Sequence, residues 1–224
     1  MRAYDAAVRL FVTALVAAAV FTGCGDDDEP AETAPTAPPA AATEALWPPS
    51  GEGSGDPRAT ARSFVEEYIG IENPALSEFR ETEPGVGEVT VHRRGEDGRA
   101  LETEVAALAL RRLDGETWSV ISAHSPEVEV TQPSARDVIT SPVRVAGRGR
   151  GFEGNVVIEV RDEYAVDPLA QRAVIAGSMG KLEPFSAKLP FDPGTDTGAI
   201  VAKTGSGIAA ADGFAAFVVR FADG

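Results

Sequence analysis

The chain has 224 residues, of which 43% are hydrophobic, and a formal net charge of −15 at neutral pH. This negative balance argues against nucleic acid as a partner, because nucleic-acid-binding proteins neutralise phosphates with clustered Lys and Arg. The single cysteine, Cys24, excludes an internal disulfide, and the two histidines leave little material for imidazole catalysis or a metal site.

Residues 1–23 have the pattern of a secretory signal peptide. Arg2 and Arg9 provide a positive start, and residues 10–21 form an apolar core of signal-peptide length. A helix across a bilayer needs about 20 apolar residues, so this core is too short to span one. We therefore predict a segment that is removed from the mature protein.

The segment closes on Phe21-Thr22-Gly23-Cys24, which resembles a bacterial lipoprotein signal. That family places a small residue directly before the cysteine, as Gly23 does here, whereas Phe21 departs from the usual leucine. The resemblance implies acyl chains on Cys24 and stable attachment to the extracytoplasmic face of the cell membrane. In the alternative, Cys24 is an ordinary residue of a secretory signal that is cleaved elsewhere.

Residues 24–56 have the composition of a disordered acidic linker. They carry eight acidic residues and no basic one, and they are rich in Pro, Ala and Thr, with almost nothing to bury. Leu46 and Trp47 are the exceptions. They are either a stray apolar pair or a short segment that docks on the domain that follows.

Residues 57–132 predict a small α+β domain. Asp56-Pro57 reads as a helix start, apolar residues then recur at helical spacing, and Gly70 follows as a stop. Three strand-like runs come next, and their alternation slips between Val105 and Leu108, which predicts a bulge or a change of buried face. We expect the helix to pack on these three runs, at residues 88–94, 99–113 and 117–125.

Residues 133–224 predict an immunoglobulin-like β-sandwich, so the whole chain is expected to be mainly β with an α+β part. Short alternating runs follow one another without a helix, in the number and spacing of a seven-stranded sandwich. The alternate apolar residues of 156–160 and of 217–221 should face inward. The seven runs are residues 136–139, 142–147, 155–161, 170–176, 184–190, 198–204 and 214–221.

Two blocks of this region, I-T-S-P-V-R-V-A-G at 139–147 and G-F-E-G-N-V-V-I-E-V at 151–160, carry a family resemblance. They resemble the immunoglobulin-like bacterial spore germination domain, in which an "sP-v-v-G" strand leads into "FEg-v-v-v-v". The resemblance covers about residues 134–222. It implies an extracytoplasmic, non-catalytic domain often joined to other modules in lipoproteins, and it implies no role in germination and no particular ligand.

Few residues of the sequence suggest catalysis or ligand binding. His92 is expected on the solvated side of its strand and His124 at a strand end, and no G-x-S-x-G spacing accompanies them. Residues 147–151, G-R-G-R-G, lack the lysine and serine of a phosphate-binding loop and predict a flexible basic turn. Our hypothesis is that Arg148 and Arg150 in this turn touch an anionic envelope polymer. We expect neither a cofactor nor enzymatic activity.

Acidic residues cluster in two predicted turns, which raises calcium as an alternative to simple solvated turns. Neither cluster has the spacing of a calcium loop, and no metal site is expected. The two sets are Asp162, Glu163 and Asp167, and Asp192 and Asp196.

Two functions fit these features best. The first is a lipid-anchored, non-catalytic protein whose immunoglobulin-like module binds another protein or an envelope polymer. The second is an accessory or regulatory subunit of a cell-wall or secretion enzyme, in which the domain at 57–132 holds the partner. An envelope enzyme is a third reading, which would need converging polar groups in a pocket.

The lipid anchor is tested by the substitution Cys24→Ala. Without the sulfur there is no site for the acyl chains, so the variant should move from the membrane fraction to the soluble fraction. Fractionation of cells followed by immunoblotting measures this directly. Unchanged partitioning of the variant would contradict the anchor.

Overall fold

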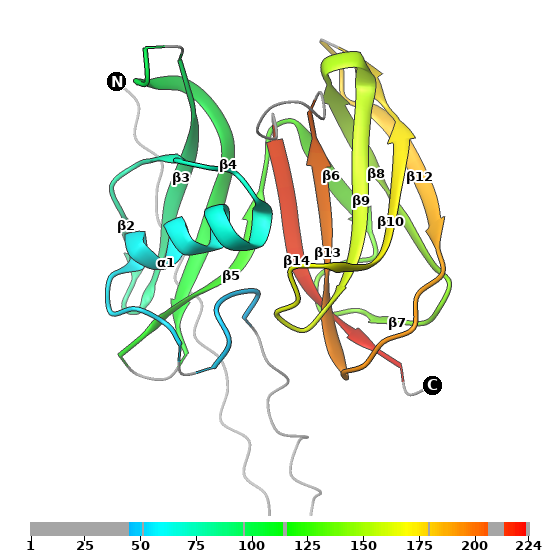
Figure 1. The fold of residues 1–224 in the computed structure, drawn as a ribbon, viewed down its shortest axis with the longest axis horizontal. Helices are drawn as coiled ribbons and strands as arrows, with labels where there is room; N and C mark the ends of the chain where they lie inside the picture. Colours follow the sequence, from blue (N-terminus) through cyan, green and yellow to red (C-terminus); the bar gives the residue numbers. More distant parts are fainter. Residues whose placement is uncertain are drawn as a thin grey trace, which may run out of the picture. The chain divides into compact units, whose positions relative to one another are not determined.

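The computed structural model describes residues 45–50, 52–95, 97–113, 116–178, 180–205 and 213–222. Cys24, the predicted signal peptide and most of the predicted linker lie outside these residues. The described part is mainly β, with one short helical segment near its start (Figure 1). None of its helices has the length and apolar character that crossing a bilayer would require.

The helical segment consists of α1 (Pro57–Ser63), which continues as the π-helical turn η1 (Phe64–Ile69). The Asp56 side chain accepts a hydrogen bond from the backbone N–H of Arg58, as an N-cap does. Gly70 ends the segment with φ +87°, a left-handed conformation that suits glycine. Both ends therefore lie where the sequence predicts them.

Five antiparallel strands follow the helical segment, and the last three correspond to the three predicted runs. The predicted slip is a bulge, because Val91 lies opposite Ala106 whereas His92 lies opposite Glu104. Val105 is the extra residue, and it is buried together with Ala106. The strands are β1 (Ala75–Leu76), β2 (Arg80–Glu83), β3 (Val86–Arg94), β4 (Ala100–Arg112) and β5 (Trp118–His124).

The rest of the described chain forms a β-sandwich. β14, β13, β9 and β10 continue the large sheet that holds β1, β3, β4 and β5, while β6, β8, β11 and β12 form a second sheet. The strands are β6 (Val128–Gln132), β7 (Val138–Ile139), β8 (Val143–Gly151), β9 (Asn155–Asp162), β10 (Pro168–Ile175), β11 (Gly177–Ser178), β12 (Glu183–Leu189), β13 (Thr197–Thr204) and β14 (Gly213–Phe221).

Every predicted sandwich run contains a strand, but the predicted count of seven is too low for the described residues. β6 and β11 are additional, and β6 pairs antiparallel with β8. Pro133 therefore directly follows a strand of the sandwich. The α+β part is also continuous with the sandwich, since Ala123 and Ser122 of β5 pair with Ala216 and Phe217 of β14.

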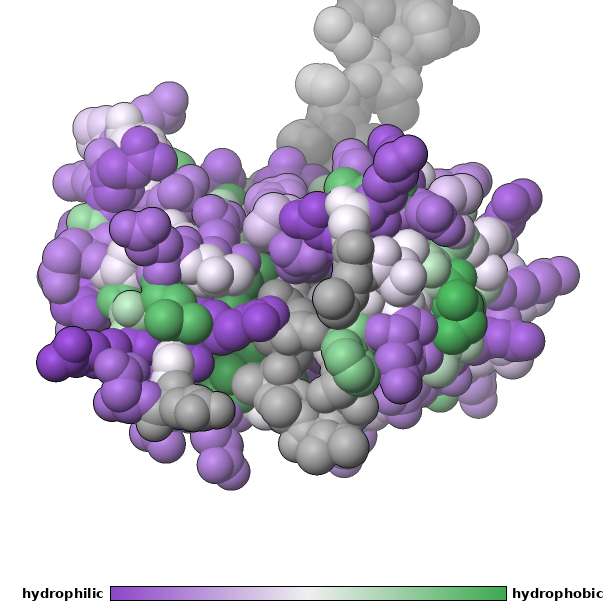
Figure 2. Space-filling view, turned by 90° about the horizontal axis from the view of Figure 1, so that it is seen from above, coloured by the Kyte–Doolittle hydropathy of each residue, from purple (hydrophilic) through white to green (hydrophobic). Residues whose placement is uncertain are grey.

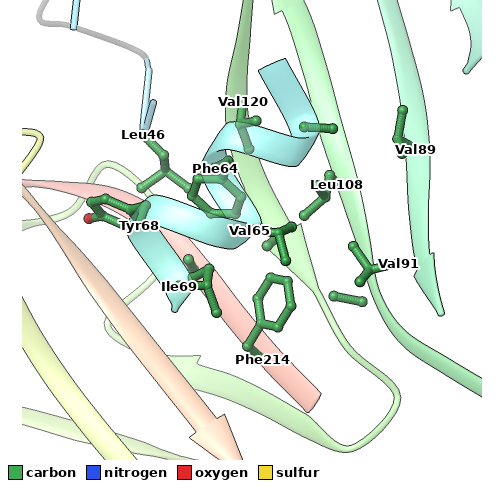
Figure 3. Packing of buried hydrophobic residues seen from close by; sticks show 14 of the residues in the cluster. Leu46, Phe64, Val65, Tyr68, Ile69, Val89, Val91, Leu108, Val120 and Phe214 are labelled. Atoms are coloured by element: carbon green, nitrogen blue, oxygen red, sulfur yellow. The ribbon is translucent and has the colours of Figure 1, made fainter. Parts of the chain in front are cut away.

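Two apolar cores lie on opposite faces of the large sheet. In the first, Phe64, Val65 and Tyr68 of the helical segment pack with residues of β3, β4, β5 and β14 (Figure 3). The second lies inside the sandwich and contains both predicted inward faces, from β9 and β14. β14 serves both cores, because Phe214, Ala216 and Val218 belong to the first and Ala215, Phe217, Val219 and Phe221 to the second.

The segment at Leu46 and Trp47 docks on the α+β part, which was one of the two alternatives. Leu46 is only 2% exposed, and its backbone N–H donates to the carbonyl of Val120 at 2.8 Å. The Trp47 ring nitrogen donates to Ser63 Oγ at 2.8 Å. Ala45 and Leu46 are therefore part of the core rather than of a solvated linker.

The G-R-G-R-G stretch is not a flexible turn, because it lies within β8. Alternate residues of a strand point to opposite faces, so the glycines face the sandwich interior and the arginines face outward. A Cβ on Gly147 would lie 2.1 Å from the Glu129 carbonyl oxygen and 2.7 Å from the Phe185 ring. Here glycine permits a close approach of β8 to β6 and β12.

We predict that Gly147→Ala destabilises the protein, because the added methyl group would push β8 away from β6. Overpacking of this kind costs about 1–3 kcal/mol. Urea unfolding followed by circular dichroism measures the change. Arg148→Ala, the next residue of the same strand but facing outward, is the matched control and should change stability by less than about 0.5 kcal/mol. Equal effects of the two substitutions would contradict the packing described here.

Candidate functional site

A buried charge cluster, formed by Tyr68, Glu159, Arg161 and Lys203, joins the helical segment to the sandwich. Glu159 and Arg161 are 2% and 3% exposed. The Arg161 guanidinium donates to both the Glu159 carboxylate and the backbone carbonyl of Tyr68, the latter at 2.6 Å. It also lies 4.5 Å from the centre of the Tyr68 ring, and Lys203 Nζ is 2.6 Å from the second Glu159 oxygen.

The charged groups of this cluster are paired with one another, whereas the buried Tyr68 hydroxyl has no hydrogen-bond partner among the described residues. Arg161 neutralises Glu159 and meets the carbonyl end of the helical segment, where a positive charge is favourable. The neighbouring cavity, lined by Tyr68, Tyr164 and Thr197 among others, holds only about 10 Å³. That volume suits one water molecule rather than a ligand. We conclude that the ion pairs of the cluster connect the helical segment to the sandwich.

The two arginines named from the sequence lie on the outward side of β8. Arg150 is engaged there, since its guanidinium donates to both Glu127 oxygens, at 2.7 and 3.1 Å, and to the Gly180 carbonyl. This ion pair raises the pKa of Arg150 above its usual value. Arg148 donates one bond, to the Leu182 carbonyl at 3.1 Å, and stays exposed. The structure thus places both arginines on the same side of β8. Mainly Arg148 remains available to bind a ligand, because Arg150 is held by Glu127.

Two further cations share this surface, which the sequence reasoning missed. Arg144 is exposed on β8 and lies directly opposite Lys188 of β12. Arg144 donates to Ser186 Oγ, and none of the ion pairs among the described residues involves Arg144, Arg148 or Lys188. We call Arg144, Arg148, Arg150 and Lys188 the basic outer face. Like charges placed opposite each other on neighbouring strands destabilise a sheet, so this face favours an anion.

A crevice of about 380 Å³ opens where β5, β6 and β14 meet. This volume lies within the range of small-ligand sites. Its lining combines apolar residues with hydroxyl groups, one imidazole and one carboxylate. The lining residues are Ser122, Ala123, His124, Ser125, Val128, Glu129, Val130, Pro133, Ser134, Ala135, Ala215 and Phe217.

The crevice contains a serine and a histidine in contact, since Ser122 Oγ lies 3.2 Å from His124 Nε2. The two share one side of β5 because they are two residues apart in a strand. Among the described residues, no carboxylate is hydrogen-bonded to His124, whereas a catalytic triad needs an acid that orients the imidazole. His92 is half-buried on β3 and separated from β5 by β4, so the two histidines do not meet.

The acidic residues considered for calcium do not form a ligand set. Asp162 accepts hydrogen bonds from the Gly194 N–H and from Thr195 Oγ1, which ties two loops together. Within the described ranges, no three His, Cys, Asp or Glu side chains are grouped so that they could hold a metal ion.

The face of the molecule shown in Figure 2 is largely hydrophilic, with small separate hydrophobic spots. The exposed large apolar side chains of the described residues come from several different elements. They are Leu101, Val138, Phe152, Val166 and Ile175. A broad apolar patch on this face is therefore not the feature that a partner would recognise.

Comparison with known families identifies a match for the sandwich part of the chain. Residues 127–208 match the immunoglobulin-like domain of bacterial spore germination. The resemblance carried by the two sequence blocks is confirmed for this part of the chain. The match begins at Glu127, directly before β6, which agrees with β6 as a sandwich strand. Comparison with curated proteins and with solved structures gave no match.

The charge cluster predicts how stability depends on pH. Burial raises the pKa of the Tyr68 phenol from 10.0 to about 12, against the opposing effect of Arg161. The folded state thus favours the neutral phenol, and this contribution is complete below pH 10 and lost as the pH rises toward 12. The loss should amount to about 2–3 kcal/mol.

Urea unfolding at several pH values measures this loss, and Tyr68→Phe is the control. The phenylalanine variant cannot ionise at this position, so its stability should fall less between pH 10 and 12 than that of the unmodified protein. Parallel curves for the two proteins would show that the phenol is not held neutral.

Proposed function

We propose that this chain is a lipid-anchored, non-catalytic binding protein of the extracytoplasmic face of the cell membrane. Its immunoglobulin-like sandwich contacts an anionic polymer of the cell envelope through the basic outer face. The family match supports a binding module. The signal-like segment ending at Cys24 supports the anchor.

The observation that carries the polymer proposal is the basic outer face itself. A chain with a net charge of −15 repels polyanions in general, yet it exposes Arg144, Arg148 and Lys188 on one side of one sheet. Arg144 and Arg148 lie about 13 Å apart, because a strand rises about 3.3 Å per residue. A linear polymer with regularly spaced phosphates can contact both along β8, while Lys188 meets it from β12.

The crevice contains the contact between Ser122 and His124, and among the described residues no carboxylate is hydrogen-bonded to His124. The accessory-subunit alternative assigns the partner to the α+β part. The helix side of the sheet in that part is filled by Leu46, Phe64 and Phe214. A partner would therefore have to bind another surface of the α+β part.

The test removes the three exposed cations by the substitutions Arg144→Ala, Arg148→Ala and Lys188→Ala in one protein. Arg150 is retained because its ion pair with Glu127 supports the sheet. The probe is poly(glycerol phosphate), with neutral dextran as the uncharged comparison, and affinity is measured by isothermal titration. We expect the variant to bind the polyanion about tenfold more weakly, and added salt to weaken binding by the unmodified protein.

The matched control removes three arginines from the α+β part, by Arg62→Ala, Arg80→Ala and Arg99→Ala. It changes the net charge by the same amount, so its affinity should stay within about threefold of that of the unmodified protein. Equal losses in both variants, or no binding by the unmodified protein, would overturn the polymer proposal.

A further inference from the structure

The crevice exposes the backbone edge of β6, as the order of its lining residues shows. Val128, Glu129 and Val130 all line it although they are consecutive. Side chains of consecutive strand residues point to opposite faces, so three in a row line a cavity only where the backbone itself faces it. Ala215 and Phe217 alternate, so their side chains form the floor.

The hydrogen bonds of β6 show which of its backbone groups face away from β8. The Glu127 carbonyl accepts from the Arg150 N–H at 2.9 Å, which makes these two residues a hydrogen-bonded pair. Pairs of this kind alternate along an antiparallel ladder, so Glu129 is bonded to Arg148, whereas Val128 and Val130 direct their N–H and C=O groups outward. In the part of the chain that the structure describes, β6 pairs only with β8.

The side chains around this edge define a pattern for an added strand. Residues next to Val128 and Val130 would face Phe217 and the sandwich interior, so they should be apolar. A residue next to Glu129 would lie on the exposed side beside a carboxylate, where a basic side chain forms a favourable cross-strand pair. No lysine or arginine lines the crevice, although Arg148 of β8 lies on the other side of Glu129.

We propose that the crevice binds a short extended peptide segment of a partner protein, which adds to β6 as a further strand. Main-chain hydrogen bonds to Val128 and Val130 supply affinity, and the alternation of apolar and basic side chains supplies selectivity. The acidic charge of the whole chain also favours a basic segment. This site adjoins the basic outer face at the Glu129–Arg148 pair, but peptide binding does not require polymer binding.

The test selects peptides from a random heptapeptide phage library on the full chain, and measures chosen peptides by fluorescence anisotropy. Selected sequences should alternate apolar and basic residues. Val130→Pro removes one outward N–H without touching the ladder to β8, and it should weaken binding about tenfold. Methylating alternate backbone nitrogens of the peptide should have the same effect, because it removes the donors on the other side.

The matched control is Ser186→Pro on β12. By the same alternation the N–H of this residue faces the opposite free edge of the sheet, so peptide affinity should not change. Glu129→Lys provides a second variant that needs no backbone change, and it should select peptides without basic residues. Circular dichroism confirms that each variant is folded.

Four results would overturn the proposal: no enriched peptide, equal binding by Val130→Pro, no effect of N-methylation, or loss of binding only when the basic outer face is removed. Sedimentation of the unmodified chain tests whether a second copy occupies the edge instead. A dimer that Val130→Pro dissociates would identify that occupant and exclude the peptide.

Discussion

The fold depends on β14 being buried on both faces. Its residues alternate between the core under the helical segment and the core of the sandwich, and β13 behaves in the same way. A strand buried on both faces reads as a continuous apolar run rather than an alternating one, which F-A-A-F-V-V at 214–219 illustrates. Neither core can form completely without β14, so the α+β part and the sandwich depend on each other for stability.

Small residues on β13 and β14 let the helical segment and the second sheet pack closely on opposite faces of the large sheet. Ala199, Ala202, Ala215 and Ala216 leave room for larger partners such as Phe64 and Phe185. On the helix side of β9, Arg161 contacts the helical segment at Tyr68, and Glu159 pairs with Arg161. Replacing such a pair by apolar residues need not lower stability, but removing one partner leaves a buried charge. The pair therefore fixes where the helical segment ends over the sheet.

Local signals in the sequence were sufficient for much of this architecture. The cap at Asp56, the stop at Gly70 and the slip near Val105 each depend on a few neighbouring residues, and each was predicted correctly. The short runs between turn signals likewise located the sandwich strands, and the period is direct for β8 and β12, which are buried on one face only. The family resemblance added the type of sandwich.

The features that were missed depend on contacts between distant residues. The glycines of β8 look like a turn until β6 and β12 are known to pack against them. Leu46 is buried by residues of β5 and of the helical segment, and Arg161 meets Tyr68, which is 93 residues away. Likewise, Arg144 and Lys188 form one surface only because β8 pairs with β12 in that register. A pattern read along the chain cannot contain such pairings.

The two proposed surfaces meet at one pair of residues. Glu129 and Arg148 lie opposite each other on β6 and β8, so the carboxylate that would attract a basic peptide also offsets one cation of the basic outer face. A peptide cation placed on Glu129 would leave Arg148 more strongly attractive to a polyanion. An exposed cross-strand charge pair contributes about 0.2–1 kcal/mol, so each ligand should strengthen the other by a small factor. Such coupling is reciprocal by thermodynamic necessity, and it links the crevice at the edge of β6 to the basic outer face.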